Sequence, residues 1–103
     1  MSDTITIARV SDTPPGTISV HEVNGVRIAL CNVNGRFYAI DDVCTHDGGP
    51  LDQGKLDGDL VECPRHGGRF NVTDGRAAVL PAVRPVKTYP VELDGDDVKI
   101  KIE

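Results

Sequence analysis

The sequence predicts a small all-β protein, a sandwich or barrel, on three observations. Val and Ile supply 20 of the 103 residues, with 7 Thr against only 6 Ala and 6 Leu, a balance that favours strands. Asn-Gly or Asp-Gly pairs stand at 24–25, 34–35, 57–58, 74–75 and 94–95, between the strand-like runs. Such pairs tolerate the positive φ angles of tight hairpin turns. No stretch shows a sustained helical period.

Seven short strands are predicted around these turns. In chain order they cover residues 5–10, 17–23, 26–33, 36–40, 59–63, 86–93 and 97–102. The last one alternates, with Val98, Ile100 and Ile102 on one face and Lys99 and Lys101 on the other, as a half-buried strand does. A chain of this length forms one core, so we expect residues 1–103 to make a single domain.

Composition excludes several classes of protein. The net charge is −5 and there is no basic patch, which argues against nucleic-acid binding. The longest apolar runs are a few residues, too short to cross a membrane. The first residues carry neither a basic stretch nor an apolar run, so no secretory signal is visible and we expect a cytoplasmic protein. In the cytoplasm, cysteines are more often metal ligands or core residues than members of a disulfide scaffold, and we expect the same of the three cysteines here.

Residues 41–76 depart from the pattern of strands and turns. This region holds seven of the eleven glycines, two of the three cysteines and two of the three histidines. It also contains an internal echo: Cys-Thr-His at 44–46 precedes Gly-Gly at 48–49, and Cys-Pro-Arg-His at 63–66 precedes Gly-Gly at 67–68. Loops of this kind, inserted into a β scaffold, are where function usually lies.

The candidate ligands in this region are Cys44, His46, Cys63 and His66. Thiolate and imidazole are the ligands that soft or borderline metals prefer. One alternative is that the four residues bind no metal and are two ordinary buried cysteines and two surface histidines. A structural zinc site is another, although zinc ribbons open with Cys-x₂₋₄-Cys and Cys-x-His is cramped for one ion. A [2Fe–2S] centre with two Cys on one iron and two His on the other removes that strain.

The segments CTHDGGPL (44–51, the first box) and CPRHGGRF (63–70, the second box) resemble the two cluster-binding boxes of Rieske proteins. The similarity is closest to the small Rieske-type ferredoxins that serve bacterial ring-hydroxylating oxygenases, and it covers nearly the whole chain. It implies a small Rieske-like β sandwich or barrel with a two-loop cluster-binding subdomain.

The resemblance also implies one Rieske [2Fe–2S] cluster. Cys44 and Cys63 would hold one iron, while His46 and His66 would hold the other, which takes up the electron. A weaker implication concerns the residues that help to cover the cluster, namely Pro50, Leu51 and Pro81.

Two departures from the respiratory, high-potential branch of the family are informative. That branch carries an extra Cys in each box, forming a disulfide clamp, whereas Gly49 and Arg65 stand here. The same branch has Ser and Tyr hydroxyls directed at the cluster sulfurs, whereas Gly68 and Phe70 stand here. Missing donors leave the reduced cluster less stabilised, so we expect a potential near the bottom of the Rieske range, roughly −150 mV.

The remaining residues of interest receive simpler interpretations. Cys31 lies on the face of its strand opposite Ile28 and Leu30 and is expected to be a small packing residue. His21 has no partner motif and is expected at the surface. A mixed-charge rim near the boxes either orients a redox partner or only aids solubility; it consists of Lys55, Arg65 and Arg69.

By this resemblance the chain is a soluble, monomeric one-electron carrier and not an enzyme. Its protein partners would be a flavin-dependent reductase and a terminal non-haem iron oxygenase. With His46 and His66 on the cluster, only His21 remains, so a 2-His-1-carboxylate iron site cannot be built. There is also no Gly-x-Gly-x-x-Gly fingerprint for a dinucleotide.

Two other functions remain open from the sequence. One is a small accessory subunit of an assimilatory nitrite reductase, a class that often lacks the cluster ligands present here. The other is a zinc-stabilised interaction module, which would be colourless where a Rieske protein is red-brown.

Overall fold

A computed structural model describes residues 4–45, 48–64, 67–80 and 82–101 of the chain. These residues form strands, turns and one 3₁₀ turn, with no α-helix among them, so the all-β prediction is confirmed. The elements are β1 (Thr4–Arg9), η1 (Val10–Asp12), β2 (Ile18–Val23), β3 (Val26–Val33), β4 (Arg36–Asp41), β5 (Leu56–Asp57), β6 (Leu60–Glu62), β7 (Arg69–Asn71), β8 (Ala77–Val79), β9 (Thr88–Tyr89), β10 (Val91–Asp94) and β11 (Asp97–Lys101). Within the described ranges, no helix is long and apolar enough to cross a membrane.

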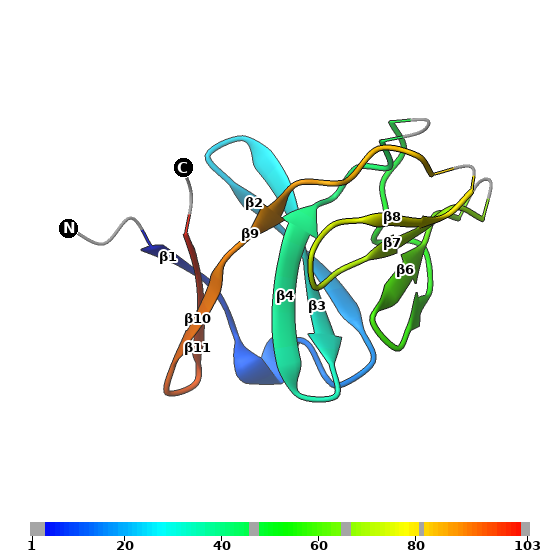
Figure 1. The fold of residues 1–103 in the computed structure, drawn as a ribbon. Coiled ribbons are helices and arrows are strands. Elements are labelled where there is room, and N and C mark those ends of the chain that lie inside the picture. Colours follow the sequence, from blue (N-terminus) through cyan, green and yellow to red (C-terminus); the bar gives the residue numbers. More distant parts are fainter. Residues whose placement is uncertain (1–3, 46–47, 65–66, 81, 102–103) are drawn as a thin grey trace.

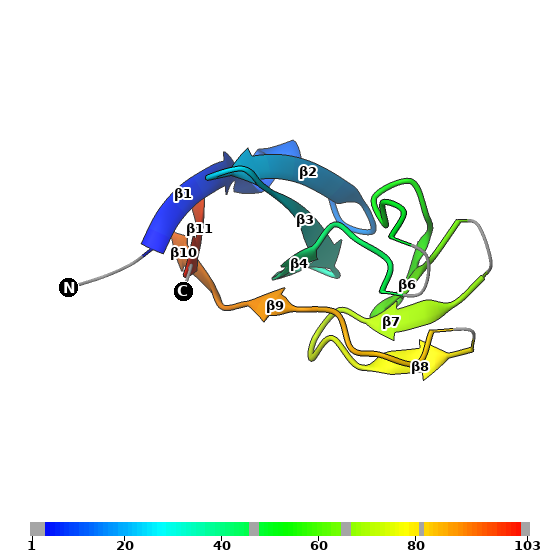
Figure 2. The same cartoon turned by 90° about the horizontal axis from the view of Figure 1, so that it is seen from above.

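The strands form three antiparallel sheets rather than a closed barrel. The terminal sheet has the order β1-β11-β10, the central sheet β2-β3-β4-β9, and the loop sheet β5-β6-β7-β8. Figures 1 and 2 show the terminal sheet at one end of the molecule, the loop sheet at the other, and the central sheet between them. The two boxes therefore lie far from both chain ends.

Strand β3 of the central sheet is buried on both faces and contributes to two cores. On β3, Ile28 and Leu30 face the terminal sheet, and Ala29 and Cys31 face the loop sheet, all with no exposed surface. The terminal core lies between the terminal and central sheets and contains Ala8, Val23, Ile28, Leu30, Phe37, Ala39, Tyr89, Val98 and Ile100. The loop-side core lies between the central and loop sheets and contains Ala29, Cys31, Ile40, Cys44, Leu51, Val61, Cys63, Phe70, Val72, Ala82 and Val86.

The hairpin turns follow the predicted chemistry, in two variants. At 24–25 and 34–35 the Asn residues have φ of 51° and 53° and the glycines 81° and 92°, the pattern of type I′ turns. At 57–58 and 94–95 the Asp belongs to the strand, and the glycine is the first residue of the loop with φ near 60°. This is the position that a type II′ turn reserves for glycine.

The observed strands differ from the predicted ones in three ways. Strands β5, β7 and β8 were missed, because two or three residues are too few to display an alternating pattern. The strand predicted over 86–93 is divided at Pro90 into β9 and β10, which belong to different sheets. Proline has no N–H with which to continue a ladder. Val10 begins η1 instead of ending β1, and there the Asp12 side chain accepts the Arg9 N–H at 3.0 Å.

Gly54 is required where the chain between the two boxes passes close to β6. A Cβ at this position would lie 1.7 Å from the Glu62 carbonyl oxygen, and Glu62 directly precedes Cys63. We expect Gly54→Ala to lower the free energy of unfolding by about 1–3 kcal/mol in denaturant titrations, because the backbone must shift to admit the methyl group.

Gly25→Asn is the control, since nothing lies within 4 Å of its Cβ position and it stands in a type I′ turn, where both central residues have positive φ and Asn is tolerated. Its cost should be about 1 kcal/mol or less. Equal losses of stability in the two variants would contradict the close-contact explanation.

Candidate metal centre

The described parts of the two boxes share the same pair of backbone hydrogen bonds. In each, the cysteine N–H donates to the carbonyl five residues later, at 2.7 Å in the first box and 2.6 Å in the second. The cysteine carbonyl accepts the N–H four residues later, at 2.7 Å and 3.0 Å. That residue is Gly48 or Gly67, each with a φ of +77°, a conformation that favours glycine. The sequence echo is therefore also a structural repeat.

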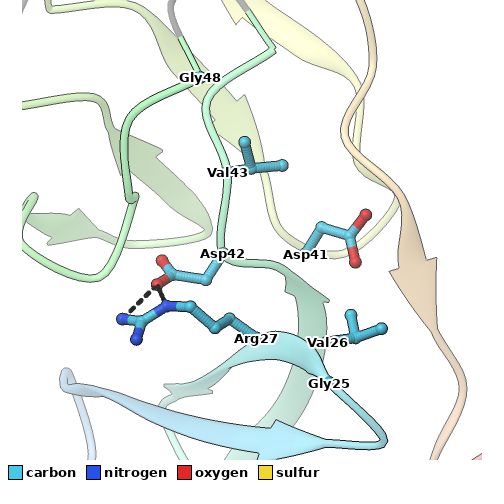
Figure 3. A pocket seen from close by; sticks show the side chains of 7 residues that line it. All are labelled: Gly25, Val26, Arg27, Asp41, Asp42, Val43 and Gly48. Atoms are coloured by element: carbon cyan, nitrogen blue, oxygen red, sulfur yellow. Dashed lines mark hydrogen bonds and ion pairs between the residues drawn. The ribbon is translucent and has the colours of Figure 1, made fainter.

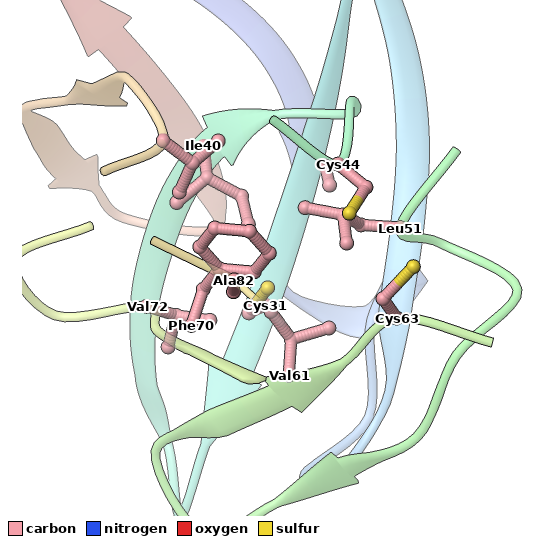
Figure 4. Close-up of a cluster of buried hydrophobic side chains, with 11 residues drawn as sticks. Cys31, Ile40, Cys44, Leu51, Val61, Cys63, Phe70, Val72 and Ala82 are labelled. Carbon is pink, nitrogen blue, oxygen red and sulfur yellow. The ribbon is translucent and has the colours of Figure 1, made fainter. Parts of the chain in front are cut away.

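The boxes bring Cys44 and Cys63 together. Their side chains are 1% and 2% exposed, and both belong to the loop-side core. Figure 4 shows both thiols directed toward the same space, with the fully buried Leu51 beside them. None of the three cysteines forms a disulfide with another, in keeping with the missing clamp.

The structure describes only some of the other residues that the resemblance implies. His46 and His66 lie outside the described residues, and no third His, Cys, Asp or Glu among the described residues joins the two cysteines in a group that could hold a metal ion. Leu51 is buried as expected, whereas Pro50 is exposed and Pro81 lies outside the described residues.

Cys31 is a packing residue, as predicted. Its side chain is fully buried in the loop-side core, on the face of β3 opposite Ile28 and Leu30. Burial, assisted by the negative charge of Asp42, raises the pKa of the Cys31 thiol to about 12. The thiol is therefore protonated at neutral pH, as in an inert, buried packing residue.

The sequence interpretation missed Asp42, which has a fully buried side chain. Its Oδ1 accepts the N–H groups of Leu51 and Asp52 at 2.9 and 2.8 Å. Its Oδ2 accepts from Arg27 Nε and Nη2 at 3.3 and 3.1 Å (Figure 3). Burial and the Asp52 carboxyl raise the pKa of Asp42, while the Asp52 N–H and Arg27 oppose this shift. The alternation of side chains along a strand could have identified Asp42 from the sequence, because it places Asp42 on the same inward face as Ile40.

A pocket of about 430 Å³ lies beside this acid and the first box. Figure 3 shows Arg27 and Asp42 on one side of it and Asp41 on the other. The pocket is lined by Gly25, Val26, Arg27, Asp41, Asp42, Val43 and Gly48.

The structure bears on two expectations about ionisable residues, and only the one for His21 needs correction. His21 is partly buried rather than at the surface; its Nε2 lies 2.7 Å from Ser19 Oγ, and burial lowers the pKa of the ring. In the expected rim, Arg69 is paired with Glu62 at 3.3 Å and with Asp57 at 3.5 Å. Lys55 is exposed, and Arg65 lies outside the described residues.

The segment after β8 closes against the first box and exposes an apolar surface. Thr45 Oγ1 donates to the Arg84 carbonyl at 2.8 Å, and Ala82 is buried in the loop-side core with the two cysteines. Around this buried alanine, three large apolar side chains face outward: Val79 is 41%, Leu80 74% and Val83 68% exposed. We call these three residues the apolar patch.

The chain matches the Rieske [2Fe-2S] domain family over residues 3–90. It is 41% identical over 99 residues to the ferredoxin component of the naphthalene 1,2-dioxygenase/salicylate 5-hydroxylase systems of a Ralstonia species, covering 96% of this chain and 95% of that protein. The ferredoxin of carbazole 1,9a-dioxygenase from Nocardioides aromaticivorans IC177 superposes with a TM-score of 0.93 at 31% identity, covering 99% of this chain and 100% of that one.

A chain from the complex of reduced oxygenase and oxidized ferredoxin in carbazole 1,9a-dioxygenase superposes with a TM-score of 0.90 at 37% identity, covering 98% of this chain and 94% of that one. These similarities extend over the whole fold and not only over the two boxes. The resemblance indicated by the boxes is thus confirmed, and the chain belongs to the Rieske [2Fe–2S] family as one of its electron-carrying ferredoxins.

Proposed function

We propose that this chain carries single electrons on one Rieske [2Fe–2S] cluster, with Cys44 and Cys63 on one iron and His46 and His66 on the other. The observation that carries the proposal is the pair of buried thiols, presented by two boxes with equivalent backbone hydrogen bonds and directed into one space. A cluster bound there would take up and release one electron.

The residues around the two thiols suit such a group. Leu51 and Phe70 are fully buried in the same core, and apolar surroundings limit the access of water to a metal centre. Cys31 lies outside both boxes, on β3, where it packs in the loop-side core. The donor set that we propose is thus the thiolates of Cys44 and Cys63 and the imidazoles of His46 and His66.

The proposed partners are a flavin-dependent reductase, which supplies the electron, and a terminal oxygenase, which receives it. The similarity to the chain from the carbazole 1,9a-dioxygenase complex supports the second partner. We further propose that residues 1–103 act as one domain, as a monomer, in the cytoplasm. Three cysteines that form no disulfide with one another suit a reducing compartment.

The apolar patch is the surface proposed to meet the oxygenase. Exposed apolar side chains that gather in one place commonly mark interaction sites. The patch flanks Ala82, which shares a core with both cysteines, so a protein seated on it would lie close to the cluster. Docking here would shorten the path for the electron.

The purified protein should contain two irons and two acid-labile sulfides per chain. Cys44→Ser and Cys63→Ser should each lose the visible absorption of the cluster, because each removes a thiolate ligand. Cys31→Ala should keep it, since Cys31 is a packing residue of β3, outside both boxes. Metal analysis and visible spectra check all three, and stoichiometric zinc without labile sulfide would falsify the cluster assignment.

The reduction potential should lie near −150 mV, at the low end of the Rieske range. Gly68→Ser and Phe70→Tyr should raise it by about 60 mV or more, because a charge-assisted hydrogen bond contributes about 1.5–3 kcal/mol and 1.4 kcal/mol corresponds to 59 mV for one electron. Protein-film voltammetry measures these potentials. Phe37→Tyr, in the terminal core, is the matched control and should leave the potential unchanged.

A wild-type potential above zero would contradict this explanation. So would an unchanged potential in both box variants when a crystal structure places the new hydroxyl at the cluster.

Leu80→Asp should weaken binding to the terminal oxygenase about tenfold or more, because it places a charge in an apolar interface. The visible spectrum of the cluster should not change. Leu93→Asp is the matched control, since Leu93 is 50% exposed on β10 in the terminal sheet. Oxygenase reduction rates at varied ferredoxin concentration provide the measurement, and equal effects of the two variants would exclude the apolar patch as the docking surface.

A further inference from the structure

The two boxes have equivalent backbone hydrogen bonds, but their ends are held in different ways. The second box connects β6 to β7, and these strands pair with each other, so that Glu62 lies opposite Arg69 at the mouth of the loop. The first box follows β4, and the next strand is β5. Among the described strands, β4 pairs with β3 and β9, and β5 pairs with β6. No strand ladder therefore closes the first box.

A side chain takes the place of the missing ladder. Asp42 lies two residues before Cys44, and its Oδ1 accepts the N–H groups of Leu51 and Asp52 at the other end of the box, at 2.9 and 2.8 Å. A carboxylate that accepts two backbone N–H groups makes strong, charge-assisted hydrogen bonds. The entry and the exit of the first box are thus joined through one buried carboxylate.

Arg27 on β3 fixes this carboxylate in turn. The Arg27 carbonyl accepts the Asp42 N–H at 3.0 Å, and its guanidinium donates to Asp42 Oδ2. The same guanidinium lies 3.9 Å from Asp52 Oδ1, a buried oxygen with no hydrogen-bond partner among the described residues. The arginine therefore offsets the negative charge at the closure and connects it to the central sheet.

We propose that Asp42 is a positioning residue for the cluster-binding site: it closes the first box and so holds Leu51 against Cys44 and Cys63. Leu51 has no exposed surface and lies beside both thiols, so a box that opens would admit water to them (Figure 4). The effect on the cluster rests on the proposed function, whereas the closure of the box does not.

The chain offers a matched control in the adjacent acid. Alternation along the strand directs Asp41 to the opposite side from Asp42 (Figure 3). Asp41 Oδ1 accepts the Tyr89 hydroxyl at 2.5 Å, a contact with β9 and not with the first box. Substituting either acid removes one negative charge from nearly the same place, but only Asp42 contacts the exit of the box.

The test compares Asp42→Ala, Asp42→Asn and Asp41→Asn in the purified holoprotein. Hydrogen exchange followed by mass spectrometry should show the peptide spanning 48–53 exchanging roughly tenfold faster or more in Asp42→Ala, because two charge-assisted bonds are lost. Release of iron to a chelator should accelerate by a similar factor. Asp42→Asn should show hydrogen exchange and iron release close to those of the wild type, since its amide oxygen can still accept the two N–H groups. Asp41→Asn should match the wild type in both measurements.

Measurements of the reduction potential separate the effect of the box geometry from the effect of the Asp42 charge. Both Asp42 variants remove the same charge, so a difference in potential between them reports the geometry of the box. The proposal is overturned if Asp42→Ala exchanges and releases iron like Asp41→Asn, or if Asp42→Asn is as impaired as Asp42→Ala. A wild-type protein without iron would sink the proposed function instead, and the exchange comparison would still decide whether Asp42 closes the box.

Discussion

The burial of β3 on both faces is the constraint on which the rest of the molecule depends. On β3, the large side chains Ile28 and Leu30 fill the terminal core, whereas Ala29 and the small Cys31 face the loop-side core. Small residues on that face leave room for Phe70 and for the boxes above it. A register slip of one residue would exchange the two faces, with large side chains under the boxes. The two type I′ turns that flank β3 fix this register.

Most of this framework could be predicted from the sequence, and the part that could not has a physical reason. The strand over 26–33 was predicted at its observed bounds, because Asn-Gly turns limit it on both sides. Strands of the loop sheet were missed where tertiary pairing creates two- or three-residue strands that have no pattern of their own. The division at Pro90 needed the knowledge that β9 and β10 belong to different sheets.

The site was predictable to the extent that it consists of ligand-type residues at characteristic spacing. The spacing of Cys44, His46, Cys63 and His66 predicted a shared centre. The thiols of Cys44 and Cys63 are directed into one space, and the two histidines lie outside the described residues. The supporting residues were harder to find, because adjacent acids such as Asp41 and Asp42 resemble a solvated strand end. Only the fold shows that one of them is buried and faces Arg27, fifteen residues earlier in the chain. The apolar patch was likewise hidden, since its residues resemble an ordinary strand.

A carboxylate in the interior needs a reason, because burying a charge is costly unless it is paired. At Asp42 the cost is offset by two N–H donors on one oxygen and a guanidinium on the other. The side chain of Arg27 remains 56% exposed, so its own charge is only partly desolvated. An apolar residue here would leave two N–H groups without acceptors, and an amide would lack the second acceptor that Arg27 requires. Aspartate is therefore the residue that can join the ends of the first box and fasten them to β3 at once. Its negative charge, two residues from a proposed ligand, would also disfavour an added electron and so help to keep the potential low.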